Sequence, residues 1–280
     1  PNFVILKILR HEVRKSYGKR LNIATVYYLA VHFLFGMYKT LKKVVKNMIP
    51  QKFLFENEVL LRSLIYPLYK GENRACNICK KHLKDFVLVE NGNLVCPVCG
   101  SLPRTRRLWK LLNENYLKPE IKVLDFSPSR ALYRKLKKNK NIHYFPTDFE
   151  NEFLADYRFD INNIDSESER FDLIICYHIL EHIDSDQQAM KELFRVLKTD
   201  GTCLIQTPFK DGETYEDFSI KTKEDRLKHF GQDDHVRIYS ISGLKERLEK
   251  SGFLVDVQTF PKDDFFGFSE NEHILVCSKK

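Results

Sequence analysis

Acidic side chains are almost absent from the first 50 residues. Ten lysines and arginines stand there against a single acid, Glu12, whereas the whole chain of 280 residues has a net charge of +8. The rest of the chain is therefore close to neutral. Because basic segments of this kind meet anionic partners, we expect the N-terminus, and not the body of the protein, to contact a membrane surface or nucleic acid.

Formal charge is also absent from Leu21–Tyr38, a stretch of 18 mostly apolar, aromatic-rich residues that basic side chains flank on both sides. This length is at the lower limit for crossing a bilayer. The pattern favours helices lying on a membrane surface, within a basic, apolar helical segment over residues 1–70. Helices packed on the protein body or on another subunit are the alternative. No small-residue cleavage site follows the apolar run, so we expect no cleavable signal peptide.

Glycine is missing from Lys122–Leu136 (KVLDFSPSRALYRKL), where an apolar strand turns into a helix. This excludes the usual glycine-rich turn, at which the backbone adopts positive φ freely. The turn reads Ser127-Pro128-Ser129 instead. Pro128 has no N–H group to donate, but it suits the first turn of a helix. Small side chains still let a cofactor approach, and the helix N-terminus still offers N–H groups to a carboxylate.

An even cysteine framework is lacking as well, since the chain has seven cysteines. Three of them, Cys176, Cys203 and Cys277, stand alone in apolar runs that resemble buried strands. An odd count with lone buried thiols indicates a reducing compartment, so we expect a cytoplasmic protein.

The other four cysteines form two C-x2-C pairs separated by sixteen residues: Cys76, Cys79, Cys96 and Cys99. Two such knuckles bring four thiolates to one point, and this spacing predicts a zinc ribbon over residues 71–105. Four sulfur ligands leave no open position, so the zinc would be structural. Two disulfides are disfavoured by the reducing compartment, and a redox dithiol is disfavoured by the second pair.

Residues 106–280 alternate strand-like and helical segments, which predicts an α/β domain with a parallel sheet covered by helices on both faces. The stretch 240–252 begins with a serine cap and ends at Gly252, as a helix does. No helix separates the last two strands, FLVDVQTF and EHILVCSKK. One of these two strands is therefore expected to be antiparallel.

Several of these segments resemble class I S-adenosylmethionine-dependent methyltransferases. Val123–Ser129 (VLDFSPS) is similar to the first motif of that family, without its glycines. Phe171–Ile183 (FDLIICYHILEHI) and Glu192–Phe209 resemble the fourth and fifth strands of the small-molecule branch. Cys96–Leu112 and His229–Ser240 further resemble a group of bacterial methyltransferases with an N-terminal zinc knuckle. The resemblance implies a Rossmann-like sheet of seven strands and a methyl-transfer reaction.

The resemblance also implies where S-adenosylmethionine would bind. Asp148 ends the second strand and could hold both ribose hydroxyls, as acids do in dinucleotide-binding folds, although it could also be a solvated loop residue. Asp160 could accept from the adenine amine, with Ile161 beside the ring. The implied cofactor residues are Asp125, Phe126, Ser127, Pro128, Ser129, Asp148, Phe149, Asp160, Ile161, Tyr177 and His178.

Acceptor residues are expected at the end of the fourth strand and in the loop after the fifth strand. A hydroxyl acceptor needs a base, for which His235 is the first candidate and His178 the second. Asp234, Arg237 and Tyr239 are predicted substrate contacts, with Arg237 suited to an anionic acceptor. A structural hydrogen bond for His235, and cofactor packing or helix capping for His178, are the alternatives.

Three functions fit these patterns. The leading hypothesis is a methyltransferase that acts on a small-molecule, glycan or lipid-linked acceptor at the inner membrane face. An RNA methyltransferase gripping RNA through the ribbon and the basic N-terminus is the second. It is disfavoured because residues 106–280 are slightly acidic and no Asn/Asp-Pro-Pro-aromatic motif follows the fourth strand. A non-catalytic scaffold with a decayed cofactor site is the third, and the retained Asp125, Asp148 and Asp160 argue against it.

Overall fold

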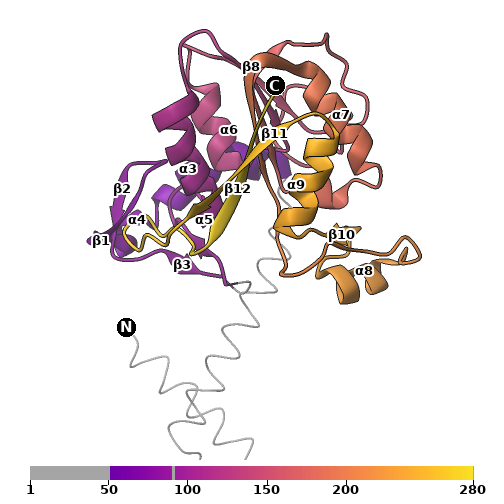
Figure 1. Ribbon diagram of the computed structural model, residues 1–280. Coiled ribbons are helices and arrows are strands. Elements are labelled where there is room, and N and C mark those ends of the chain that lie inside the picture. The colour runs from indigo at the N-terminus through magenta and orange to yellow at the C-terminus, as the bar shows by residue number, and fades with distance from the viewer. Residues whose placement is uncertain (1–50, 90–91, 280) are drawn as a thin grey trace, which may run out of the picture. The chain divides into compact units, whose positions relative to one another are not determined.

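The computed structural model describes residues 51–89 and 92–279 (Figure 1). The chain divides into two compact units, Pro1–Glu58 and Val59–Lys280. The predictions for residues 1–50, Leu21–Tyr38 included, lie outside the described residues. Within the described part, no helix has the length and apolar character needed to cross a bilayer. This part begins with two helices, α3 (Gln51–Ser63) and α4 (Tyr66–Tyr69).

Two small antiparallel hairpins follow and carry the paired cysteines. They are formed by β1 (Lys70–Cys76) with β2 (Lys81–Leu83), and by β3 (Val87–Leu88) with β4 (Leu94–Val95). In each C-x2-C turn the N–H group of a left-handed residue donates to the carbonyl of the first cysteine. These donors are Lys80 (φ 60°, 2.8 Å) and Gly100 (φ 74°, 2.9 Å). The tight turns hold both thiols of each pair on one side.

Helix α5 (Pro103–Leu111) and the turn η1 (Leu112–Tyr116) connect the hairpins to a six-stranded sheet of order β11-β12-β8-β7-β5-β6. Its strands are β5 (Lys122–Phe126), β6 (His143–Thr147), β7 (Phe171–Tyr177), β8 (Leu197–Gln206), β11 (Leu254–Phe260) and β12 (Glu272–Ser278). The first four are mutually parallel, whereas β12 runs antiparallel to both β8 and β11. This confirms the expected antiparallel strand at the end of the chain.

Helices cover both faces of the sheet, as predicted (Figure 1). One apolar core joins the sheet to α7 (Asp186–Val196) and α9 (Ile241–Lys250). The other core joins its opposite face to α5, to α6 (Arg130–Lys137) and to the cysteine hairpins. Neighbouring strand residues such as Leu173 and Ile174 alternate between the two cores, because successive side chains of a strand point to opposite faces.

The cysteine hairpins are tied to the far end of the chain by a buried arginine of α5. The Arg106 side chain is fully buried and stacks on Phe86, with 3.9 Å from the guanidinium carbon to the ring centre. Its nitrogens donate to the carbonyls of Leu94, Ser101, Phe266 and Gly267 at 2.7–3.1 Å. The first two carbonyls belong to the hairpins and the last two to the β11–β12 connection. One side chain therefore links segments about 160 residues apart.

The main sheet has six strands among the described residues, where the resemblance implies seven. Residues 149–165, the place of the additional strand beyond β6, make only isolated bridges. There the N–H of Phe159 donates to the Thr147 hydroxyl (2.7 Å), and the N–H of Asn162 donates to the Asp160 carboxylate (2.8 Å). Backbone N–H groups that donate to side chains cannot donate to a neighbouring strand, which explains why residues 149–165 do not form the additional strand.

The remaining elements lie between β8 and β11. They are β9 (Tyr215–Glu216), α8 (Lys223–Phe230) and β10 (Arg237–Ile238), and β9 pairs with β10. The predicted serine cap of the next helix is confirmed, because the Ser240 hydroxyl accepts from the N–H of Gly243 at 3.1 Å. A short turn, η2 (Leu180–His182), follows β7 and contacts β10.

Candidate active site

The carboxyl ends of the parallel strands meet at one edge of the sheet, where ligands of such folds bind. Two residues there adopt left-handed backbone conformations, Ser127 after β5 (φ 44°) and His178 after β7 (φ 57°). Their N–H groups donate to the carbonyls of Thr147 (2.7 Å) and Gln206 (2.8 Å) on the neighbouring strands. The turn without glycine therefore still reaches positive φ, and backbone strain of this kind concentrates at functional sites.

Asp148 connects the ends of β5 and β6. Its side chain is 5% exposed. One carboxylate oxygen accepts from the Ser127 hydroxyl at 2.7 Å, and the other accepts from the N–H groups of Glu152 (2.6 Å) and Phe153 (3.0 Å). Phe149, next to it, is exposed. Asp148, which was predicted to bind the ribose, thus lies at the strand end. Three hydrogen-bond donors of the protein already hold its carboxylate in place.

Asp125 lies beneath this turn and is fully enclosed. The Tyr144 hydroxyl donates to its carboxylate at 2.7 Å. Burial raises the pKa of Asp125 to about 7, although the Tyr144 hydrogen bond works in the opposite direction. On the adenine side, Ile161 is buried in the core, and the half-buried Asp160 accepts from the N–H of Asn162.

Buried polar atoms without a protein partner gather at the ends of β7 and β8. Among the described residues, the atoms of this kind at or beside these strand ends are Tyr177 Oη, His178 Nε2, Glu181 Oε2, Gln206 Oε1, Thr207 Oγ1, His235 Nε2 and Glu272 Oε1, whereas others, such as Asn77 Oδ1, lie elsewhere. Buried polar atoms in folded proteins are normally hydrogen-bonded. Buried polar atoms left without a protein partner at the ligand-binding edge of the sheet therefore indicate a site for a polar ligand.

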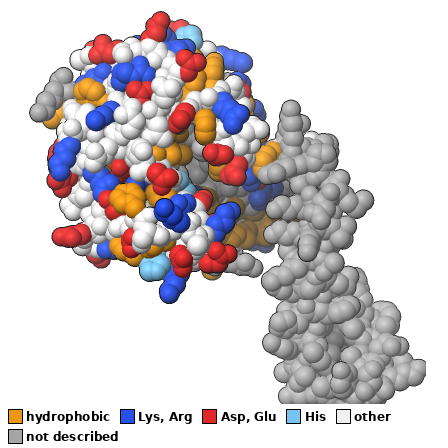
Figure 2. Space-filling model, turned by 90° about the vertical axis from the view of Figure 1, so that its right-hand side faces the viewer, with side chains coloured by type: hydrophobic (Ala, Val, Ile, Leu, Met, Phe, Trp, Pro, Cys, Tyr) orange, Lys and Arg blue, Asp and Glu red, His pale blue; other side chains and the backbone are white. Residues whose placement is uncertain are grey.

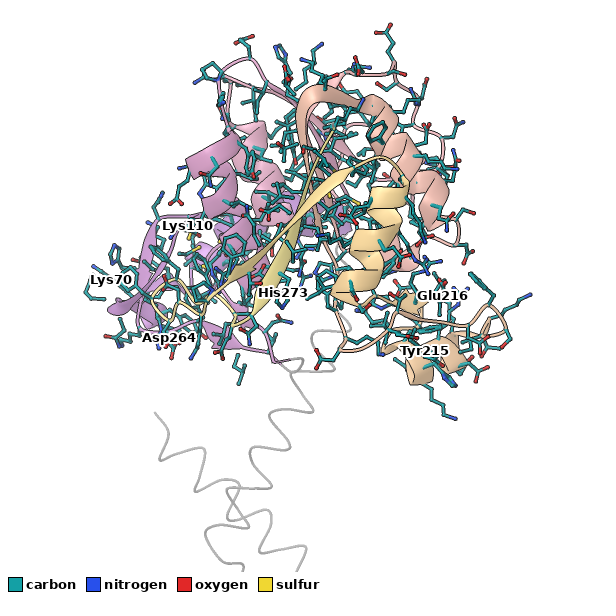
Figure 3. The ribbon with its side chains drawn as sticks, in the orientation of Figure 1. Lys70, Lys110, Tyr215, Glu216, Asp264 and His273 are labelled. Carbon is teal, nitrogen blue, oxygen red and sulfur yellow. The ribbon has the colours of Figure 1, made fainter. Side chains whose placement is uncertain are left out.

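A cavity of about 250 Å³ adjoins this cluster. Its lining includes Gln206, Thr207 and Phe209 from β8 and the residues after it, with Glu272 and His273 from the start of β12. His273 is labelled in Figure 3. A larger, open hollow of about 860 Å³ includes Lys122 and Arg170 in its lining. These residues stand at the amino ends of β5 and β7, so the hollow is at the wrong edge of the sheet for this fold's ligands.

The η2 turn places a carboxylate between two histidines. The side chain of Glu181 is 1% exposed, and its Oε1 lies 3.2 Å from Nδ1 of His178. Burial alone would raise the pKa of Glu181, but the hydrogen bond and charge of His178, with the charge of His182, lower it. Glu181 therefore stays ionised inside the protein.

His235 packs against this turn from the other side. Its ring meets the ring of His182 edge-to-face, with 4.7 Å between ring centres. Burial lowers the pKa of His235, and the nearby His182 lowers it further. The neutral imidazole is consequently favoured. Asp234, predicted to contact the substrate, is instead 3.3 Å from Nδ1 of His182.

Arg237 and Tyr239, two predicted substrate contacts, are both completely buried. Arg237 donates to the carbonyls of Leu180, Ile183 and Asp184 and pairs with the carboxylates of Glu216 and Asp186. The Tyr239 hydroxyl donates to Asp186 at 2.6 Å. In the described structure these side chains hold η2 onto β10, because a buried guanidinium needs every donor satisfied. Neither presents a polar group to a substrate.

No sequence pattern predicted a role in the site for Arg104, Gln206, Thr207 or Glu272. Gln206 and Thr207 end a parallel strand, a position that the strand order could have marked as ligand-facing. Burial lowers the pKa of Arg104, whereas the charges of Glu272 and Glu181 raise it, so this cation shares their surroundings. Glu272 comes from the antiparallel strand β12, and no local pattern connects it with β7.

The four predicted zinc ligands are brought together. All their sulfur atoms lie within 4.8 Å of one another, with 3.6 Å between Cys76 and Cys99 and 3.8 Å between Cys79 and Cys96. The thiols are free, not disulfide-bonded. Zinc–sulfur bonds of about 2.3 Å in a tetrahedron require sulfur atoms about 3.8 Å apart. The donor set and its spacing therefore fit a tetrahedral zinc ion.

The parallel strands, flanking helices and polar carboxyl edge define a protein of the α/β methyltransferase class. The model of a methyltransferase domain family matches residues 103–258, more than half of the chain. The chain therefore belongs to this family of S-adenosylmethionine-dependent methyltransferases. Among curated proteins, no match was found.

Solved structures with a similar backbone share little sequence with the chain. An S-adenosylmethionine-dependent methyltransferase from Archaeoglobus fulgidus is 16% identical, with a TM-score of 0.47, over 63% of this chain and 93% of that one. A possible histamine N-methyltransferase from Thermotoga maritima is 18% identical, with a TM-score of 0.44, over 62% and 89% of the two chains. A Haemonchus contortus phosphoethanolamine N-methyltransferase, solved with S-adenosylhomocysteine, is 14% identical, with a TM-score of 0.43, over 62% and 52%. At these scores, the family assignment rests on the family model.

Proposed function

We propose that the protein transfers a methyl group from S-adenosylmethionine to a small polar acceptor at the carboxyl ends of β7 and β8. The observation that carries this proposal is the group of orphaned buried polar atoms beside the cavity of about 250 Å³. A volume of this order accepts a group the size of one sugar ring or one lipid headgroup. The acceptor class we infer is thus a small molecule, or the polar end of a glycan or lipid.

The residues at this edge fit the cofactor. Ser127, Asp148 and Asp160 would hold its polar groups, and the exposed ring of Phe149 would lie against its base. S-adenosylmethionine, when bound, supplies a methyl group on a sulfonium. Methyl transfer is an in-line displacement in which the acceptor atom bonds to the methyl carbon while the carbon–sulfur bond breaks. The protein's main task is to align the acceptor with that bond.

We infer that His178 is the base for a hydroxyl acceptor. Its Nδ1 is held by Glu181, which orients the ring, and its Nε2 has no protein partner among the described residues. An ionised carboxylate beside a histidine also stabilises the imidazolium that forms when the ring takes a proton. The acceptor's proton would therefore move to Nε2 of His178 as the new bond forms.

Calorimetric titration of the full chain with S-adenosylhomocysteine tests this proposal. We expect micromolar binding that Asp148→Ala weakens at least tenfold, because the carboxylate that holds the strand ends and meets the ribose is lost. Asp165→Ala, an exposed acid at the other edge of the sheet, is the matched control and should change nothing. His178→Gln should keep the binding and lose turnover with polar acceptors. Absence of binding to the folded wild type would refute the enzymatic reading.

The face of the protein drawn in Figure 2 favours a small acceptor over an RNA chain. On the face shown in Figure 2, lysines and arginines are interspersed with aspartates and glutamates, and no continuous basic track crosses it. Phosphate-backbone binding needs several basic side chains along one path. Salt-sensitive nanomolar affinity of the full chain for RNA would turn the assignment toward the RNA methyltransferase alternative.

We also propose that the protein works at a membrane face. Six apolar side chains that follow the basic N-terminal segment are exposed: Val59, Leu60, Leu61, Leu64, Ile65 and Leu68. Exposed apolar groups of this extent mark interaction surfaces. Together with the basic residues before them, they suit an anionic bilayer.

Vesicle pelleting tests the membrane proposal. The full chain should sediment with phosphatidylserine-containing vesicles and much less with pure phosphatidylcholine. The double substitution Leu64→Glu with Leu68→Glu should reduce the bound fraction several-fold. Leu227→Glu changes another exposed leucine, on α8, and should have no effect. Equal sedimentation of all variants would contradict the role of these residues.

We propose finally that the cysteine quartet holds a structural zinc ion. The free thiols and the tetrahedral spacing of their sulfur atoms support this. The Ser101 hydroxyl, 3.2 Å from the sulfur of Cys99, would hydrogen-bond to a thiolate ligand. With four sulfur ligands the ion has no open position, so its role would be to stabilise the hairpins.

A further inference from the structure

A second group of metal-ligating side chains lies at the carboxyl end of β7. One ligand atom from each of Glu181, His182 and His235 lies within 4.8 Å of the other two. Glu181 and His182 belong to η2, and His235 comes from the segment before β10. The group is independent of the cysteine quartet, with which it shares no residue.

Two of the three side chains are buried and end in atoms that lack a protein partner. Glu181 is 1% exposed and His235 is 3% exposed. Neither Glu181 Oε2 nor His235 Nε2 has a hydrogen-bond partner among the described residues. An acceptor-only carboxylate oxygen and a nearby imidazole nitrogen, both dehydrated and unpaired, cost free energy unless something binds between them.

The other polar atoms of the group are already oriented. Glu181 Oε1 is taken by His178, which leaves Oε2 available. His182 Nδ1 lies 3.3 Å from the Asp234 carboxylate, which leaves Nε2 available. Metal-bound histidines usually give their second nitrogen to a carboxylate in this way, which fixes the tautomer and the ring orientation.

The fold holds the two halves of the group in register. The N–H of Val236 donates to the carbonyl of Glu181 at 2.9 Å. The buried Arg237 next to it binds the carbonyls of Leu180, Ile183 and Asp184. These bonds explain why Arg237 is buried away from the substrate: it positions His235 against η2.

We propose that Glu181, His182 and His235 bind a divalent transition-metal ion. Two imidazoles and one carboxylate form a ligand set that zinc, manganese or iron accepts, with positions left open for other ligands. Ligand bonds of about 2.0–2.2 Å require ligand atoms roughly 3.0–3.5 Å apart. Because the ligand atoms already lie within 4.8 Å of one another, small side-chain movements would bring them to this spacing when the ion binds.

The ion would stand beside His178, at the acceptor end of the site. An open coordination position there can take an acceptor oxygen and make its proton easier to remove. Nε2 of His178 would then receive that proton. This catalytic role rests on the proposed function, whereas the binding of the ion does not.

Equilibrium dialysis of the full chain against micromolar Zn²⁺, Mn²⁺ or Co²⁺ tests the site by metal analysis. We expect two metal equivalents per chain in the wild type and one in His235→Ala, because the quartet keeps its own ion. Co²⁺ at the second site should add weak visible bands without thiolate charge-transfer absorption. This readout needs neither cofactor nor acceptor, so its failure is separate from failure of the proposed function.

Two further variants keep the test decisive. His182→Gln changes a partly exposed ligand and covers the case in which His235→Ala does not fold. His229→Ala removes an exposed histidine on α8 that pairs with Tyr215, and it should retain two equivalents. One equivalent in the wild type that His235→Ala and His182→Gln also keep, or two in a folded ligand variant, would overturn the proposal.

Discussion

At the residue scale, Asp125 shows how burial overrides composition. The sequence places an acid at the end of an apolar strand, and the structure encloses it with the Tyr144 hydroxyl as its hydrogen-bond donor. Burial raises the pKa of Asp125 from 3.8 to about 7. Between these values, folded Asp125 keeps a proton that the unfolded chain releases.

The contribution of Asp125 to stability should therefore fall as pH rises. It is complete below about pH 4 and is lost as pH rises through about 7. As the pH rises from 5 to 8, we expect the ionisation of Asp125 to lower the free energy of unfolding by on the order of 2–3 kcal/mol. Asp125→Asn should remove this slope, as measured by urea unfolding at both pH values.

Asp264→Asn is the control for Asp125→Asn, because Asp264 is exposed and paired with Lys262 (Figure 3). The Lys262 hydrogen bond lowers the pKa of Asp264, so this group does not titrate between pH 5 and pH 8. Its substitution should leave the pH dependence as in the wild type. The same slope in the Asp125→Asn variant would show that other groups cause it.

At the element scale, α5 acts as the joint between the cysteine hairpins and the sheet. Arg106 binds carbonyls on both sides, and Gly267 allows the close approach. A β-carbon at Gly267 would stand 2.5 Å from the Phe86 ring and 2.8 Å from the Arg106 guanidinium. The position also has φ 63°, which favours glycine.

Arg106→Lys should destabilise the protein although the charge is kept. Lysine cannot reproduce the planar fork that serves four carbonyls, and it leaves buried acceptors without donors. We expect a loss of roughly 3 kcal/mol in the free energy of unfolding, measured by urea denaturation. Lys110→Gln, on the exposed side of the same helix, should change it by less than about 0.5 kcal/mol. An equally small loss for Arg106→Lys would mean that water replaces the guanidinium.

At the scale of the whole molecule, the cysteine hairpins and the sheet share one core. Cys76, Leu83 and Phe86 pack in the same cluster as Val123 and Ile175 of the sheet. A separate ribbon on a linker would unfold without disturbing its neighbour, but a shared core couples the two. Loss of the proposed zinc ion should therefore weaken the methyltransferase fold itself.

Chelation tests this coupling. Removing the metal should lower the thermal midpoint of the single main transition by several degrees, followed by near-ultraviolet circular dichroism. Cys79→Ser should start at the lower midpoint and no longer respond to chelator. Cys203→Ala changes a buried thiol outside the quartet and should respond as the wild type does. A separate early transition with an unchanged main midpoint would contradict the coupling.

Much of this protein could be predicted where the signal is local. The cysteine spacing places four sulfurs together, the Ser240 cap begins α9, and apolar runs mark the strands. These features depend on residues a few positions apart, or on a spacing that is typical of metal-binding cysteine pairs. The number of strands in the main sheet did not follow from local patterns. The N–H groups of Phe159 and Asn162 donate to side chains, and sequence patterns do not reveal these hydrogen bonds.

The sequence by itself determined the class of fold and the cysteine cluster, and it predicted the edge of the sheet at which a ligand would bind. The tertiary structure decided which side chains face that edge. Arg237 was expected to bind substrate, yet it is buried because carbonyls more than 50 residues earlier complete its hydrogen bonds. Glu272 and His235 reach the site only through packing between distant segments. Burial and long-range hydrogen bonding are properties of the folded chain. They decide which side chains are enclosed and which face the edge of the sheet, and the spacing of residues in the sequence does not show this.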